Sequence, residues 1–177
     1  MSAADAVDLV ASVESAGIAL WLDGGWAVDA ALETQTRSHD DLDVVVELHD
    51  VDRLQVILES RGYVLASGGA PKSFEMTDPS GRQVDVHPVV FTDSGDGSYL
   101  MENGEEWLYP AAGFAGEGRI LGRPVRCLTP EVQMLCHTGY EPHLGSFDDV
   151  WTLSRHFRIP VPEEYRRPRD SYAQRQL

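Results

Sequence analysis

Two aspartates separated by one residue are the most informative chemical feature of the sequence. Asp41 and Asp43 belong to the run DLDVVVEL at 41–48, which is β-branched, mostly apolar and predicts a strand. Side chains of a strand alternate between its faces, so both carboxylates point the same way, about 7 Å apart along the chain. Two carboxylates at that spacing can hold one divalent cation or a pair of them, and Mg²⁺ prefers such oxygen ligands.

A third carboxylate could complete this site. In Val84-Asp85-Val86-His87 a single acid alternates with apolar residues, where a solvated strand face would more often carry Lys, Thr or Glu. If the strand of Asp85 lies beside that of Asp41, the three acids cluster at one place. Taken alone, Asp85 is explained equally well as a structural acid satisfied by its neighbours.

A glycine pair precedes these acids and has the context of a phosphate-binding turn. Gly24-Gly25 follows an apolar strand and leads into a short helix, so backbone N–H groups and the helix dipole would face an anion. Arg37, four residues before Asp41, is the nearest cation that could reach a phosphate, and Lys72 is a weaker candidate. Most such turns are only turns, and it is the ordered combination with the aspartates that indicates a phosphate and metal site.

The elements that must position these residues alternate between helix and strand. Apolar residues at helical spacing predict helices over 6–16, 26–32 and 50–62, and short apolar runs predict strands over 18–22, 41–48, 63–67, 73–77 and 82–91. The turn Asp78-Pro79-Ser80-Gly81 makes a hairpin of the last two strands. The pattern predicts an α/β (α+β) fold: a short mixed sheet flanked by helices, with the carboxylates at one edge.

The second half of the chain is less regular. Residues 92–118 are expected to form loops, and the aromatic residues within them could either line a pocket or pack as a satellite cluster. Residues 120–128 predict a hairpin, Thr129-Pro130 begins a helix, and Ser146 begins another through a capping box. We therefore expect a core over 1–128 and a small C-terminal helical segment with a polar tail over 129–177.

Charge and composition exclude several classes of function. The 177 residues contain 29 acids and 14 Lys and Arg, a formal net charge of −15, which disfavours a nucleic-acid partner. No apolar run is long enough to span a membrane. The two cysteines show neither a disulfide framework nor a metal-ligand spacing, which favours the reducing cytoplasm. Zinc-ligand spacings, the GxSxG elbow and the P-loop are all absent from the sequence.

Four motifs in order resemble the antibiotic-modifying branch of the nucleotidyltransferase superfamily. They are WLDGGWAVD at 21–29, RSHDDLD at 37–43, DVHP at 85–88 and HTGYE at 137–141. The sequence is most similar to the small lincosamide nucleotidyltransferases, and the first two motifs also resemble aminoglycoside 2''-nucleotidyltransferases. The similarity spans about Leu20 to Tyr140 and is poor over 92–118, where the acceptor is expected to be selected.

The resemblance implies a role for each motif residue. It implies the minimal nucleotidyltransferase fold. In that fold, Asp41 and Asp43 would bind two Mg²⁺ ions and the triphosphate of ATP. The resemblance further implies that Gly24 and Gly25 hold the phosphates, to which Arg37 is a candidate addition by its position. Asp85 is implied to be the general base that accepts the proton of an antibiotic hydroxyl and to contact the metal. The reaction would transfer AMP to a lincosamide and release pyrophosphate.

The acceptor implied by the resemblance is a cationic, hydroxyl-bearing antibiotic. Its site is expected to use Trp107, Tyr109, His137 and Tyr140 as walls, and acids of the 92–118 segment to attract the amine, namely Asp93, Asp96, Glu102, Glu105 and Glu106. Taken singly, each of these residues is better explained as a solvated loop residue. An aminoglycoside is the alternative acceptor. A different class of function, a catalytically inactive binding or antitoxin-like protein, is disfavoured by retention of all three aspartates. The sequence leaves open whether two chains form a homodimer.

Overall fold

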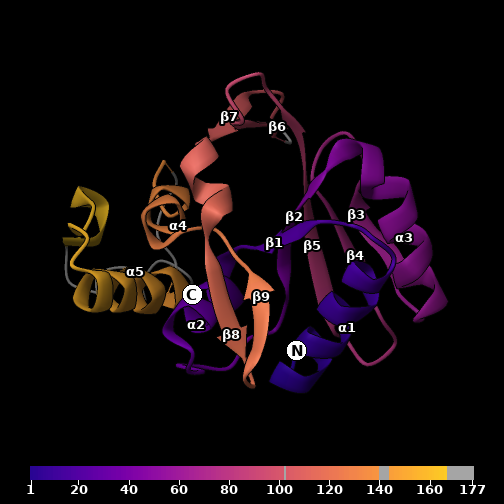
Figure 1. The fold of residues 1–177 in the computed structure, drawn as a ribbon, viewed down its shortest axis with the longest axis horizontal. Coiled ribbons are helices and arrows are strands. Elements are labelled where there is room, and N and C mark those ends of the chain that lie inside the picture. Colours follow the sequence, from indigo (N-terminus) through magenta and orange to yellow (C-terminus); the bar gives the residue numbers. More distant parts are fainter. Residues whose placement is uncertain (102, 140–143, 167–177) are drawn as a thin grey trace, which may run out of the picture.

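A mixed sheet of seven strands forms the centre of the protein in the computed structural model, which describes residues 1–101, 103–139 and 144–166. The strand order β1-β2-β5-β4-β3 continues from β5 into β6 and β7 (Figure 1). The bounds are β1 Leu20–Leu22, β2 Asp43–Glu47, β3 Val64–Gly68, β4 Phe74–Thr77, β5 Gln83–Phe91, β6 Gly97–Leu100 and β7 Glu106–Tyr109. A separate hairpin pairs β8 Glu117–Ile120 with β9 Arg123–Arg126.

Five α-helices and three short 3₁₀ helices surround the strands in the described residues. Their bounds are α1 Ala3–Ser15, α2 Gly24–Leu32, α3 Val51–Ser60, α4 Pro130–Cys136, α5 Leu144–Phe157, η1 Leu48–Asp50, η2 Ala111–Ala115 and η3 Glu163–Arg166. Figure 1 shows α1 and α3 on one side of the molecule and α4 and α5 on the other. The predicted mixed sheet flanked by helices is therefore confirmed.

The two faces of the sheet have different partners because strand residues alternate between them. On one face, valines of β2 and β5 pack with Phe74 and Met76 of β4 and with apolar residues of α1 and α3 in the largest core cluster. The other face carries Val45, Val89 and Tyr99, which pack with Leu128 and Val132 near α4. Asp43 and Asp85 alternate with the core valines, so they lie on this second face.

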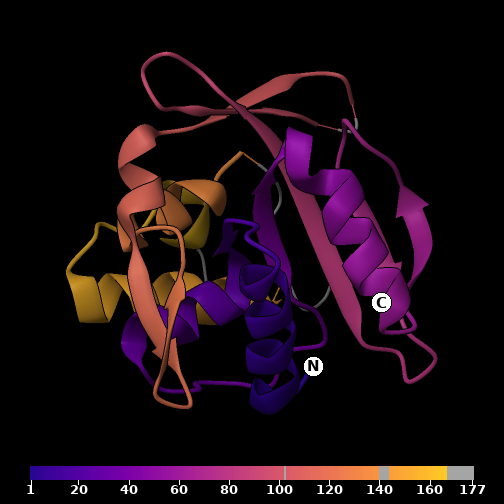
Figure 2. The ribbon, with the colours of Figure 1, turned by 45° about the vertical axis from the view of Figure 1, so that its right-hand side comes forward.

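The segment 92–118, expected to be loops, contains β6, β7, η2 and the start of β8. The strands β6 and β7 form a ribbon that continues from the far end of β5 and rises above the sheet (Figures 1 and 2). Each has four residues, and cross-strand pairing of Tyr99 with Trp107 joins them. Strands this short in a glycine-rich segment form through pairing with an existing sheet edge, which a local pattern does not reveal.

The C-terminal helices pack against α2, and α4 also packs on the second face of the sheet through Val132. Val28 of α2 contacts Met134 of α4 and the buried residues Phe147, Val150 and Leu153 of α5. The second of these helices begins at Leu144, so Ser146 is an internal residue and not the expected N-cap. The tail from residue 167 lies outside the described residues, and the division at 128/129 stays a prediction.

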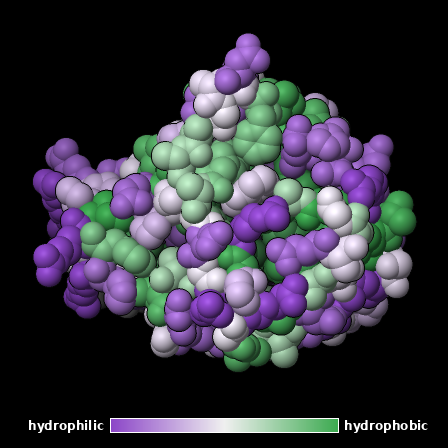
Figure 3. Space-filling model, in the orientation of Figure 1, coloured by the Kyte–Doolittle hydropathy of each residue, from purple (hydrophilic) through white to green (hydrophobic). Residues whose placement is uncertain are grey.

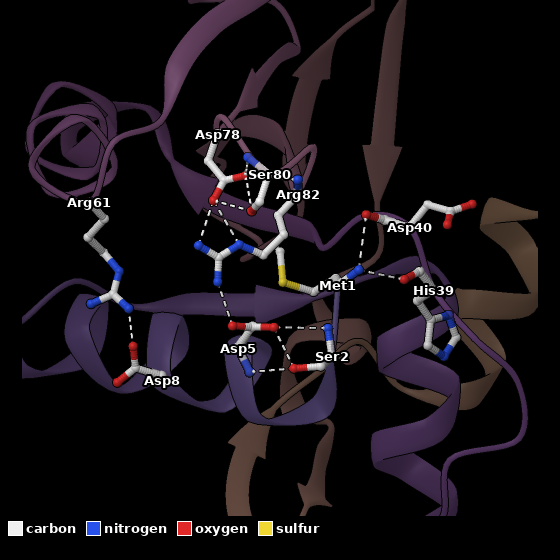
Figure 4. Close-up of polar contacts among 10 residues, drawn as sticks. All are labelled: Met1, Ser2, Asp5, Asp8, His39, Asp40, Arg61, Asp78, Ser80 and Arg82. Atoms are coloured by element: carbon white, nitrogen blue, oxygen red, sulfur yellow. Dashed lines mark hydrogen bonds and ion pairs between the residues drawn. The ribbon is translucent and has the colours of Figure 1, made fainter.

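Polar contacts fix α1 beside the sheet (Figure 4). Ser2 caps the helix in a capping box with Asp5, and Asp5 also accepts a hydrogen bond from Arg82, which bonds to Asp78 in the β4–β5 turn. The amino group of Met1 donates to the carbonyl of His39 at 2.7 Å. The N-terminus, just before the first helix, therefore contacts the loop that leads directly into Asp41.

Hydrophilic residues cover much of the face shown in Figure 3, as expected for a chain with 29 acids. Within the described part of the chain, no helix combines the length and apolar content needed to cross a bilayer.

Candidate active site

The parallel pairing of β2 with β5 brings the predicted acids together. Asp43 is the register partner of Asp85, and the pairing continues with Val45 opposite His87. One atom each from Asp43, Asp85 and His87 lies within 4.8 Å of the others. Asp41 precedes the strand by two residues, but Leu42 continues the ladder, because its carbonyl accepts from Asp85 N at 3.0 Å. The result is a cluster of acids around one histidine.

The charges in this cluster shift one another. Burial raises the pKa of Asp85 to about 6, with the carboxylates of Asp43 and Asp41 adding to the rise and His87 opposing it. Burial by itself would lower the pKa of His87, but the surrounding carboxylates raise it to about 9. His87 Nε2 lies 3.9 Å from an oxygen of Asp43 and of Asp85. The carboxylates of this cluster therefore favour a positive charge at the position of His87, as the ligands of a metal site must.

The glycine pair lies directly against the acids. The structure begins α2 at Gly24, with Asp23 as its N-cap, and Gly24 has a φ of +58°. A Cβ on Gly24 would overlap the carboxylate of Asp43, and one on Gly25 would overlap Arg37 and His39. Glycine is thus required here for close approach of the backbone to the acids. The first helical N–H, that of Gly24, donates to Asp23 Oδ1 at 2.8 Å.

A cleft of about 1010 Å³ opens over this arrangement. Nine of the residues predicted for the site line it: Gly24, Gly25, Arg37, Asp41, Asp43, Asp85, Trp107, Tyr109 and His137. Tyr140 lies outside the described residues, as does Glu102. Of the predicted acidic lining, Glu105 and Glu106 border the cleft. Asp96 instead accepts hydrogen bonds from Ser94 in its own turn and from the backbone N–H of Ala111 in η2, and Asp93 does not line the cleft.

The position of Arg37 differs from the simple expectation of a free phosphate ligand. Its Nε and Nη2 donate to the two oxygens of Asp149 at 2.9 and 2.6 Å, and His137 Nε2 lies 3.8 Å from the same carboxylate. Next to it, His39 and Asp29 form a buried pair at 2.5 Å. These pairs connect the 33–42 loop to α5 and α2, and so hold the C-terminal helices at the cleft.

Some polar residues of the cleft were not predicted as site residues from the sequence. Asp23, His87, Ser146 and Asp149 line the cleft. His87 had a local signal, because a residue two positions after Asp85 on a strand shares its face. Asp23 also had a local signal, because it is an acidic N-cap candidate directly before the glycines. In the structure, burial raises the pKa of Asp23. Ser146 and Asp149 had none, since α5 reaches the cleft only through packing on α2.

Asp149→Asn is expected to lower the free energy of unfolding by about 2 kcal/mol at neutral pH, because it leaves Arg37 without its buried partner. Burial alone would raise the pKa of Asp149, but the hydrogen bonds from Arg37 and the nearby His137 outweigh it and lower the pKa below 3.8. A depressed pKa stabilises the fold above the unfolded value, and this stability is lost as pH falls through the folded pKa. The difference from wild type should therefore shrink below about pH 4 in urea titrations.

An exposed ion pair provides the matched control. Asp8 pairs with Arg61 across α1 and α3, and its side chain is 67% exposed. Asp8→Asn should change the free energy of unfolding by less than about 0.5 kcal/mol. Equal losses in the two variants would show that the Arg37–Asp149 contact contributes no more than a surface pair.

Comparison with known proteins agrees with the motif resemblance. The model of the aminoglycoside-2''-adenylyltransferase family matches residues 6–150. A lincosamide resistance protein from Staphylococcus haemolyticus is 28% identical over 124 residues, which are 70% of this chain and 76% of the relative. A 2''-aminoglycoside nucleotidyltransferase from Escherichia coli is 30% identical over 122 residues, 67% of this chain, and the match spans 63% of that relative's length.

Solved structures share the fold. The lincosamide antibiotic adenylyltransferase LnuA with lincomycin bound superposes with a TM-score of 0.74 at 26% identity, over 84% of this chain and 93% of that one. ANT(2'')-Ia in complex with adenylyl-2''-tobramycin has a TM-score of 0.68 at 21% identity, over 96% and 95%. The region matched by the family model contains the three aspartates and both glycines, and this chain is a nucleotidyltransferase that belongs to the aminoglycoside-2''-adenylyltransferase family.

Proposed function

We propose that the protein transfers AMP from ATP to a hydroxyl of a lincosamide antibiotic and releases pyrophosphate, in a Mg²⁺-dependent reaction. The observation that carries the proposal is the register pairing of Asp43 with Asp85 beside the N-terminus of α2, in one cleft. Carboxylates and a helix N-terminus are the groups that a metal-bound triphosphate needs.

The donor set suits magnesium. Asp41, Asp43 and Asp85 offer the oxygen ligands that Mg²⁺ prefers, and all three border the cleft. With its pKa raised to about 9, His87 carries a proton near neutral pH before a metal binds, and its Nε2, 3.9 Å from Asp43 and Asp85, places a positive charge beside these carboxylates. When bound, two Mg²⁺ ions would neutralise charge on the phosphate oxygens and on the departing pyrophosphate.

Asp85 has the properties of a general base. A hydroxyl is a poor nucleophile at neutral pH, so a carboxylate within hydrogen-bond reach must take its proton as the oxygen attacks the α-phosphorus. The bond to the pyrophosphate oxygen breaks as the new P–O bond forms, and the proton passes to Asp85. With a pKa of about 6, Asp85 is ionised at neutral pH yet basic enough to accept it.

The walls of the cleft favour an acceptor with one amine and an apolar part. Met101, Tyr99, Trp107 and Tyr109 supply apolar and aromatic surface on one side. The relative from Staphylococcus haemolyticus is named for lincosamide resistance. An aminoglycoside is the second candidate, because Glu105 and Glu106 also border the cleft and a polycation needs several acids.

Incubating the protein with lincomycin, ATP and Mg²⁺ should add one adenylyl group to the antibiotic by mass spectrometry, with one pyrophosphate released. Omitting Mg²⁺ with a chelator present should abolish the product. A parallel arm with tobramycin separates the two acceptors: adenylated tobramycin with unmodified lincosamides would contradict the lincosamide assignment. Replacing ATP by GTP or CTP in the same assay tests the nucleotide.

A further inference from the structure

We propose that Glu75 on β4 binds the cationic amine of the acceptor in a second cavity that meets the cleft at Asp85. The inference rests on the proposed function, because it assigns the acceptor's place relative to the general base. Glu75 is the register partner of Asp85 across β4 and β5, just as Asp43 is across β2 and β5. The three acids therefore form one row over three neighbouring strands.

The second cavity has a volume of about 540 Å³ and lies on the β4 side of Asp85. It shares Asp85, Tyr99 and Met101 with the main cleft. Its other lining residues are Ser67, Ser73, Phe74, Glu75 and Asn103. Asp85 thus stands at the boundary between two spaces, with the glycine pair in one and Glu75 in the other.

This arrangement separates the two substrates. The triphosphate belongs to the space with the N-terminus of α2, and the attacking hydroxyl must approach the α-phosphorus from the side away from pyrophosphate. Asp85 must touch that hydroxyl, so the acceptor extends from Asp85 away from the glycines. The cavity beside Glu75 is a space that the described residues leave there, next to the part of the main cleft that Tyr99 and Met101 line.

The lining of this cavity suits a cation with apolar surroundings. Among the described residues that line it, Glu75 and Asp85 are the two with a carboxyl group, and none carries a basic group. Asp85 is committed to the proton of the hydroxyl, which leaves Glu75 for the positive charge of the protonated amine. The side-chain amide of Gln83 donates to Glu75 Oε1 and orients the carboxylate. Phe74, Tyr99 and Met101 supply the apolar contact for the rest of the ligand.

Replacing Glu75 with glutamine removes the charge and keeps the shape. We expect Glu75→Gln to weaken binding of lincomycin about tenfold, the effect of losing one charge-assisted hydrogen bond. The KM for Mg-ATP should stay the same and kcat should change less than about threefold, because the nucleotide side is untouched. An analogue whose amine is acylated, and so uncharged, should bind both proteins equally, an outcome that a merely structural role of Glu75 would not produce.

Isothermal titration of lincomycin and tobramycin into the full chain tests the inference independently of turnover. Ser67→Lys, at an exposed position lining the same cavity, should also weaken both ligands, whereas Glu59→Gln on α3 should not. The inference is overturned if Glu75→Gln binds both ligands like wild type, if the acylated analogue is weakened equally, or if wild type binds neither ligand. Wild-type protein that binds lincomycin in a Glu75-dependent manner but transfers no AMP would contradict the proposed function alone.

Discussion

Asp85→Asn is expected to lower the rate of adenylyl transfer by about 10²–10⁴-fold, the usual contribution of a general base. The substitution preserves the size of the side chain but removes the proton acceptor. Asp41 and Asp43 remain, so Mg-ATP should still bind. Steady-state release of pyrophosphate measures the rate, and titration with a fluorescent ATP analogue in the presence of Mg²⁺ measures nucleotide binding.

The variant also has an internal check on folding. Burial raises the pKa of Asp85, which means that its ionised form disfavours the folded state. Neutralising it should therefore leave the melting temperature of the metal-free protein at pH 8 no lower than that of wild type. Unchanged turnover would remove Asp85 as the base, and loss of Mg-ATP binding would assign it chiefly to the metal.

Gly24→Ala is expected to reduce turnover about 100-fold or more, because the new methyl group must displace the carboxylate of Asp43. Misplacing a catalytic group by about 1 Å is enough for an effect of that size. The backbone at Gly24 has a φ of +58°, which costs an L-residue about 1–2 kcal/mol in addition. Turnover and the affinity for Mg-ATP should therefore fall together.

A second glycine separates the two causes. Gly62 follows α3 with a φ of +90°, and a Cβ there would meet nothing within 4 Å. Gly62→Ala should lose about the same 1–2 kcal/mol in chemical denaturation but keep full activity. Similar activities in the two alanine variants would show that the contact between Gly24 and Asp43 is not required for catalysis.

Much of the candidate site follows from local patterns. The alternation of apolar and acidic residues places Asp43 and Asp85 on one face of their strands, and glycine after a strand predicts the start of α2. Such patterns are reliable because, once one face of a strand is buried, the alternation of side chains determines which face each residue of the strand points to. The order of the motifs was specific enough to indicate the family, which the comparisons confirm.

Other features depend on residues far apart in the sequence. Arg37 appears free until α5 brings Asp149 against it across 112 positions. The strands β6 and β7 are too short to be recognised alone and form on the extension of β5. Both arise from pairing partners that a local window does not contain.

The sequence by itself determined which residues could do the chemistry: the acids at strand spacing, the glycine pair before them and the acidic balance of the chain. The tertiary structure decided how they meet. The parallel pairing of β2 with β5 sets Asp43 opposite Asp85, and the antiparallel pairing of β4 sets Glu75 on the other side. The physical reason is that strand register depends on two segments together, whereas the face of the strand to which a side chain points depends on one segment alone.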